Sequence, residues 1–143
     1  MFQTPMSTTE VKQLSPVTLA FLGDAVYALW VRERLVRFGD GKLSELNRTA
    51  ANVLSARGQS AFLERVLPLL TQEEEEIFRR GRNAKKPTKS KHATAAEYNR
   101  STGFEAVLGY LYLIGDVDRI ETLLSLTREE ELKGQAVAKP FKP

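Results

Sequence analysis

Two apolar segments, each with one charged side chain near its middle, constrain this chain more than any other feature. They are residues 17–31, VTLAFLGDAVYALWV, where Asp24 is the only charge, and residues 101–115, STGFEAVLGYLYLIG, where Glu105 is the only charge. Both segments have the character of core helices. A buried lone carboxylate costs several kcal/mol unless it is hydrogen-bonded, paired or bound to metal. Both acids therefore call for an explanation.

Small residues surround both acids. An alanine lies four residues on either side of Asp24, Gly23 precedes it, and Gly109 lies four residues after Glu105. Small side chains let two helices approach closely, so the carboxylates would converge if these faces meet. Two carboxylates in a helical core favour a hard cation, and Mg²⁺ is the expected ion. The alternative is that each acid caps a neighbouring helix or pairs with a buried arginine.

The remaining patterns predict an all-α fold of five to seven helices. Ser15-Pro16 is a typical helix start, and residues 71–74, TQEE, form a capping box whose acidic run 73–76 is expected to be an exposed first turn. We find no run of β-branched alternation. The predicted organisation is a lead-in over 1–13, one compact domain over 14–132 and a flexible tail over 133–143. Helices are expected near 17–38, 44–55, 59–70, 93–114 and 116–126, with another opening after residue 71.

Composition excludes several classes of protein. The 143 residues contain no cysteine and one histidine, His92, which rules out disulfides, a thiolate metal site and a histidine-rich zinc site. The N-terminus lacks the apolar region of a signal peptide. The longest apolar stretch, 17–31, is shorter than the roughly 18 residues that a membrane span needs. A cytoplasmic location is expected.

A basic strip occupies residues 79–92, RRGRNAKKPTKSKH, with seven Lys or Arg and no acid, whereas the rest of the chain has 14 basic and 18 acidic residues. Such a concentration indicates a polyanionic partner. The strip has no interleaved aromatic residues, which favours a duplex backbone over stacked single-stranded bases. The alternative is a solvated loop that aids solubility. The candidate RNA-binding residues are Arg80, Arg82, Asn83, Lys85, Lys86, Lys89 and Lys91.

Three motifs resemble the ribonuclease III family. Residues 21–26, FLGDAV, resemble its signature helix, and residues 104–113, FEAVLGYLYL, resemble its second catalytic helix. Residues 80–85, RGRNAK, resemble the Mini-ribonuclease III branch, which lacks the appended RNA-binding domain. The resemblance implies an all-α homodimeric endonuclease for double-stranded RNA. It also implies Asp24 and Glu105 as metal ligands, Mg²⁺ with Mn²⁺ as a substitute, and precursor 23S ribosomal RNA as substrate, with a ribosomal protein helping to present it.

Two positions depart from the family pattern. Ala20 and Thr102 stand where the classical domain has two further acids, which leaves the number of metal ions open. The leading hypothesis is a Mg²⁺-dependent endoribonuclease that leaves a 5′-phosphate, with Asp24 and Glu105 as its catalytic residues. One rival is a non-catalytic scaffold that binds double-stranded RNA. Another is a helical interaction module whose acids are structural.

Overall fold

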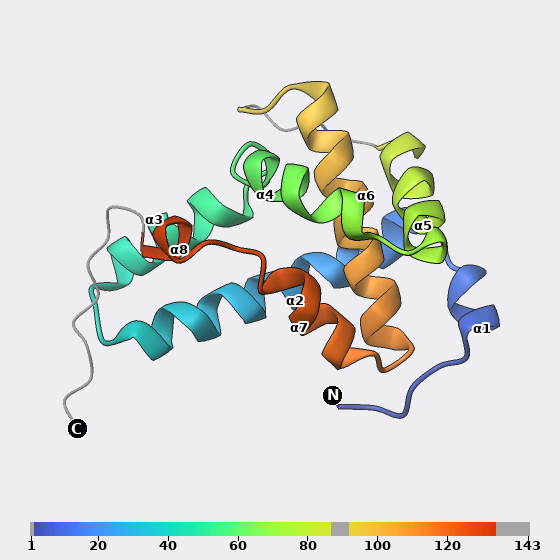
Figure 1. Cartoon of the computed structure of the whole chain (residues 1–143), viewed down its shortest axis with the longest axis horizontal. Coiled ribbons are helices and arrows are strands. Elements are labelled where there is room, and N and C mark those ends of the chain that lie inside the picture. The colour runs from blue at the N-terminus through green and yellow to red at the C-terminus, as the bar shows by residue number, and fades with distance from the viewer. Residues whose placement is uncertain (1, 87–91, 134–143) are drawn as a thin grey trace.

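The computed structural model describes residues 2–86 and 92–133. These residues form eight α-helices and one short 3-10 helix, so the all-α prediction is confirmed. Figure 1 shows the two longest helices, α2 and α6, crossing, with α5 beside α6. The elements are α1 (Thr8–Lys12), α2 (Pro16–Phe38), α3 (Leu43–Leu54), α4 (Gln59–Val66), η1 (Leu67–Leu69), α5 (Gln72–Asn83), α6 (Ala95–Leu113), α7 (Val117–Leu124) and α8 (Glu129–Lys133).

Helix boundaries follow local signals in the sequence. The Ser15 side chain accepts a hydrogen bond from the Val17 N–H at the start of α2, and Pro16 occupies the first helical position. Capping boxes open α5 at Thr71 and α6 at Thr94. The predicted tail over 133–143 and the candidates Lys89 and Lys91 lie almost entirely outside the described residues, which reach Lys133.

The close crossing of α2 and α6 depends on two glycines. A Cβ atom placed on Gly23 would lie 1.7 Å from the Glu105 carbonyl oxygen, and one on Gly109 would lie 2.0 Å from the Leu19 carbonyl oxygen. The two backbones therefore touch, and any larger residue would force the helices apart. This crossing brings the middle of α2 next to the middle of α6.

An aromatic cluster fixes α4 against the crossed pair. The ring centroids of Tyr27, Phe62 and Phe104 lie 5.4 to 6.0 Å apart. These side chains come from α2, α4 and α6, and all three are buried. Tilted and edge-on aromatic contacts of this kind add to the free energy of apolar burial. Through Phe62 the cluster packs the middle of α4 against α2 and α6.

The prediction of five to seven helices did not include α1 and α8. Each has only five residues, too few for a helix that is stable in isolation. Tertiary contacts hold them instead: Val11 of α1 and Leu132 of α8 are buried, and Arg80 donates to the carbonyl oxygens of Lys12 and Leu14. The expected lead-in thus contains a docked helix. Within residues 2–86 and 92–133, no helix is long and apolar enough to cross a bilayer.

Candidate active site

The helix crossing places Asp24 of α2 and Glu105 of α6 on one surface pocket of about 460 Å³. Ala20 and Thr102, the two positions that depart from the family pattern, line the same pocket. The structure therefore brings together the two carboxylates that the sequence singled out. The lining residues are Val17, Ala20, Phe21, Asp24, Leu54, Ser55, Ala56, Lys86, Tyr98, Ser101, Thr102 and Glu105.

The expectation that both acids are buried is wrong for Asp24. Its side chain is exposed, whereas Glu105 is partly buried. The reason is that α2 is not covered at this point: Phe21, which lines the same pocket, is 83% exposed. The apolar character of residues 17–31 thus reflects a surface as well as a core. Asp24 faces solvent at the pocket rim, where a cation or a phosphate could reach it.

Electrostatics within the pocket favour a cation. Burial raises the pKa of Glu105 to about 8, and the negative charge of Asp24 adds to this rise. A hydrogen bond from Gln59 opposes it by stabilising the ionised form. Two carboxylates that repel each other in a partly dry site gain most from a positively charged ligand. Oxygen donors of this kind suit Mg²⁺ or Mn²⁺.

No sequence motif singled out Gln59 of α4, which contacts Glu105. Its Nε2 donates to Glu105 Oε2 over 3.2 Å and to the Leu54 carbonyl oxygen over 2.9 Å. A signal was present, because Gln59, Phe62 and Val66 share the apolar face of α4. A fully buried glutamine in an otherwise apolar stripe requires polar partners.

The basic strip divides into residues with different surroundings. Arg80 is engaged with backbone carbonyls of the α1 region, and Arg82 lies 5.8 Å from the Phe78 ring centroid and donates to Asn83 Oδ1. Asn83 and Lys85 are exposed. These side chains mark the C-terminal end of α5 as a basic surface.

Lys86 differs from the other strip residues because it lines the carboxylate pocket. Its Nζ donates to the carbonyl oxygens of Arg82, at 3.1 Å, and Ala84, at 2.7 Å. Burial lowers the pKa of its ammonium group. A cation held by neutral carbonyls beside two acids is suited to contact a phosphate that enters the pocket.

Comparison with known proteins decides the family. Residues 17–116 match the ribonuclease III domain. The chain belongs to the ribonuclease III family. It is 45% identical over 122 residues to the Mini-ribonuclease 3 of Symbiobacterium thermophilum, covering 85% of this chain and 94% of that protein. It is 41% identical over 117 residues to the Mini-ribonuclease 3 of a Thermoanaerobacter species, covering 82% of each chain.

A solved structure agrees with this assignment. A crystal structure of a protein from Fusobacterium nucleatum superposes with a TM-score of 0.74 at 29% identity, covering 82% of this chain and 93% of that one. The protein is therefore an endoribonuclease of the ribonuclease III type, a class that acts on double-stranded RNA and uses a divalent metal ion.

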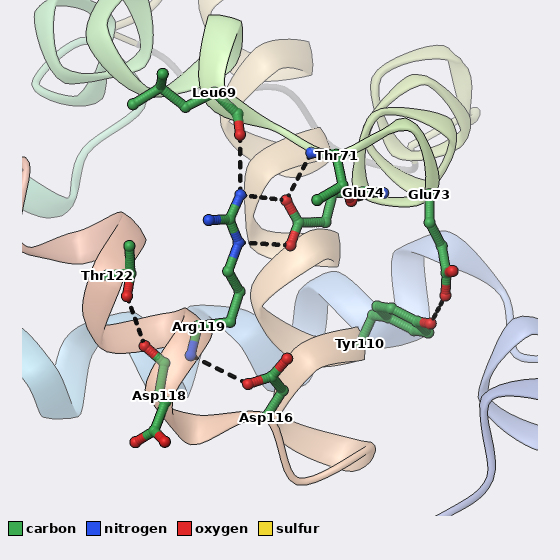
Figure 2. A network of polar contacts seen from close by, with 9 residues as sticks. All are labelled: Leu69, Thr71, Glu73, Glu74, Tyr110, Asp116, Asp118, Arg119 and Thr122. Atoms are coloured by element: carbon green, nitrogen blue, oxygen red, sulfur yellow. Dashed lines mark hydrogen bonds and ion pairs between the residues drawn. The ribbon is translucent and has the colours of Figure 1, made fainter.

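An ion pair between a buried glutamate and a partly buried arginine anchors α5, the helix that carries the basic surface (Figure 2). Arg119 of α7 makes two contacts of 2.9 Å with Glu74 and a third with the Leu69 carbonyl oxygen. Burial alone would raise the pKa of Glu74, but hydrogen bonds from Arg119 and Thr71 lower it. The expectation that the acidic run is an exposed turn is therefore wrong for Glu74, whereas Glu73 is exposed and contacts Tyr110.

Asp24 and Glu105 are the two carboxylates that line the pocket of this ribonuclease III domain. Within the described part of the chain, no three His, Cys, Asp or Glu side chains gather at one place. Thr102 Oγ1 donates to the Tyr98 carbonyl oxygen of its own helix, over 3.0 Å. Water and RNA phosphate, both of which Mg²⁺ accepts readily, could supply further oxygen ligands beside the carboxylate pair.

Proposed function

We propose that Asp24 and Glu105 hold Mg²⁺, or Mn²⁺ in its place, for hydrolysis of phosphodiester bonds in double-stranded RNA. The observation that carries this proposal is the shared pocket of the two carboxylates at the crossing of α2 and α6. When bound, the cation would supply activation of water and neutralisation of charge at the phosphate. The products expected from the family are a 5′-phosphate and a 3′-hydroxyl.

The side chains around the carboxylate pair have separate tasks. Asp24 and Glu105 provide the oxygen ligands, and Lys86 binds the phosphate beside them. Arg82, Asn83 and Lys85 extend phosphate binding along the duplex, with Lys89 and Lys91 proposed to continue it. Arg80 contributes less, because its guanidinium also serves backbone carbonyls near α1. Contacts to phosphate and sugar hold a duplex with little regard to its sequence.

Cleavage of a labelled duplex with and without Mg²⁺ tests the catalytic proposal. We expect wild-type cleavage to require Mg²⁺ and Asp24→Asn to abolish it. The variant should remain folded, because Asp24 is exposed and its charge opposes that of Glu105. Asp118→Asn, at an exposed carboxylate on α7, is the matched control and should cleave normally. Binding without cleavage by the wild type would refute catalysis and favour a scaffold that only binds RNA.

The proposed substrate is precursor 23S ribosomal RNA, processed near its ends in the cytoplasm with a ribosomal protein as a presenting partner. The motifs shared with the Mini-ribonuclease III branch support this assignment. A duplex made from paired precursor ends should be cut faster than an unrelated duplex of equal length, and added ribosomal proteins should increase the difference. Equal rates on both duplexes, with and without those proteins, would contradict it.

A homodimer is proposed because α2 carries an uncovered apolar surface beside the carboxylate pocket. Phe21 is 83%, Leu29 61% and Val36 54% exposed. An apolar pocket of about 380 Å³ adjoins this helix, with Leu22, Val26, Tyr112 and Leu113 among its lining residues. Contiguous apolar surface of this kind favours association with a partner. A two-fold dimer would present two carboxylate pockets, one for each strand of a duplex.

A further inference from the structure

Gln59 is a buried polar side chain at a position where the fold alone would favour an apolar one. Its exposed fraction is 0%, and it shares the apolar face of α4 with Phe62, Leu63 and Val66, which are also buried. An amide in such surroundings lowers stability unless its hydrogen-bonding groups are satisfied. The contacts of the buried Gln59 amide therefore indicate what this side chain contributes.

The direction of the amide is fixed by the backbone. The Leu54 carbonyl oxygen can only accept a hydrogen bond, so the NH₂ group of Gln59 must face it, at 2.9 Å. The same NH₂ group then reaches Glu105 Oε2 at 3.2 Å. Among the described residues, Gln59 Oε1 is buried without a hydrogen-bond partner. The Gln59 amide thus donates a hydrogen bond to Glu105, while its own oxygen accepts none from the described residues.

A tight turn before α4 holds Gln59 in place. Ser55 Oγ accepts a hydrogen bond from the Gly58 N–H, and the Ser55 carbonyl oxygen accepts one from the Gln59 N–H, both at 2.9 Å. A Cβ atom on Gly58 would lie 1.6 Å from the Asn52 carbonyl oxygen, so the turn excludes larger residues there. The donor is therefore preorganised toward Glu105 before any ligand binds.

We propose that Gln59 is a positioning residue that orients the Glu105 carboxylate for binding the catalytic cation. This inference rests on the proposed function of the carboxylate pair. By holding Oε2, the amide restricts the rotation of the carboxylate, and Glu105 would then offer its other oxygen, Oε1, as a ligand when a cation is bound. Partners that orient metal ligands in this way commonly change metal affinity by about 10- to 100-fold when removed.

The test measures metal binding directly, in the absence of RNA. Titration of the full chain with Mn²⁺, with free Mn²⁺ read by electron paramagnetic resonance, gives a dissociation constant that does not depend on cleavage. We expect Gln59→Met to raise this constant by about 10-fold or more. Gln59→His, which retains an N–H donor, should give an intermediate value. Ser60→Ala, which removes a hydrogen bond to Glu97 at the neighbouring position, is the control and should match the wild type.

Cleavage assays over a range of Mn²⁺ concentrations complete the test. Gln59→Met should need about 10-fold more Mn²⁺ for half-maximal rate, yet approach the wild-type rate at saturation. A folded Gln59→Met variant with wild-type Mn²⁺ affinity would overturn the role of Gln59, and so would a reduced maximal rate with unchanged affinity. Failure of the wild type to bind Mn²⁺, or metal-independent cleavage by it, would instead overturn the proposed function itself.

Discussion

Replacing Glu105 by glutamine should make the metal-free protein more stable while abolishing its activity. The substitution keeps the shape of the side chain, and its amide oxygen can still accept the hydrogen bond from Gln59 Nε2. It removes a negative charge that is partly buried and lies near Asp24. Stability gained by neutralising one side chain at the expense of activity is typical of functional sites, where a group is held in an unfavourable environment.

The size of the effect follows from the pKa of Glu105, which rises from 4.5 to about 8 in the folded protein. Because the folded state retains the proton between these two values, wild-type stability falls as pH rises through that window. By about pH 7.5 about three pH units of this window have been crossed, which corresponds to a loss of about 4 kcal/mol in wild-type stability. Glu105 is partly exposed, so solvent screening reduces the expected gain for Glu105→Gln to about 2–3 kcal/mol. At about pH 4 the difference should vanish.

Urea unfolding in the presence of a chelator measures this difference across the pH range. Glu76→Gln, at an exposed carboxylate of α5, controls for the loss of one negative charge and should show a much smaller change. Adding Mn²⁺ should stabilise the wild type and leave Glu105→Gln unaffected, because only a binding-competent native state gains from the ligand. A variant that is less stable than the wild type at about pH 7.5, or a gain that does not depend on pH, would refute the reasoning.

Three further predictions test the surfaces around the site. The double charge reversal Arg82→Glu and Lys85→Glu should weaken duplex binding about 10-fold or more in a filter-binding assay, and should also reduce the salt dependence of binding. The control Arg128→Glu, next to α8 and far from α5 (Figure 1), should change neither. Phe21→Glu should shift a homodimer to monomer in analytical ultracentrifugation, and an unchanged mass would contradict the proposed interface. Gly109→Ala should destabilise by about 3 kcal/mol or more in urea unfolding, because its Cβ would meet a backbone carbonyl of α2 at 2.0 Å.

The main helices were predictable because their signals are local. Ser15-Pro16 starts α2 and the capping box at Thr71 opens α5, as the sequence indicates. The helix expected over 59–70 instead ends at Val66, and the short 3-10 helix η1, which contains Pro68, follows it. Helices α1 and α8 were not predictable in this way. Burial of Val11 and a hydrogen bond from Arg80 hold α1, and burial of Leu132 and an ion pair between Arg65 and Glu131 hold α8. Short helices depend on tertiary packing more than on propensity.

The candidate site was predictable in its acids but not in its surroundings. Lone charges in apolar helices identify Asp24 and Glu105, and the neighbouring glycines indicate that these helices meet. The sequence could not show that Asp24 is exposed, because apolar residues facing a core and apolar residues facing an uncovered surface have the same spacing. The sequence also did not indicate that Glu74 pairs with Arg119, 45 residues away, or that Gln59 donates a hydrogen bond to Glu105. These contacts depend on how the helices pack.

The glycine crossing explains why the carboxylate pair persists despite its repulsion. Gly23 and Gly109 set the separation of α2 and α6 through backbone contacts, and neither contact involves a charge. The helices therefore cannot move apart to relieve the repulsion between Asp24 and Glu105 without losing the packing of the core. Two ways of relieving it remain: Glu105 can take up a proton, or the pair can bind a cation. The NH₂ group that Gln59 presents to Glu105 favours the ionised carboxylate, and so favours the cation. The same packing that forms the core thus keeps the two carboxylates together at the pocket where we propose that a divalent metal ion binds.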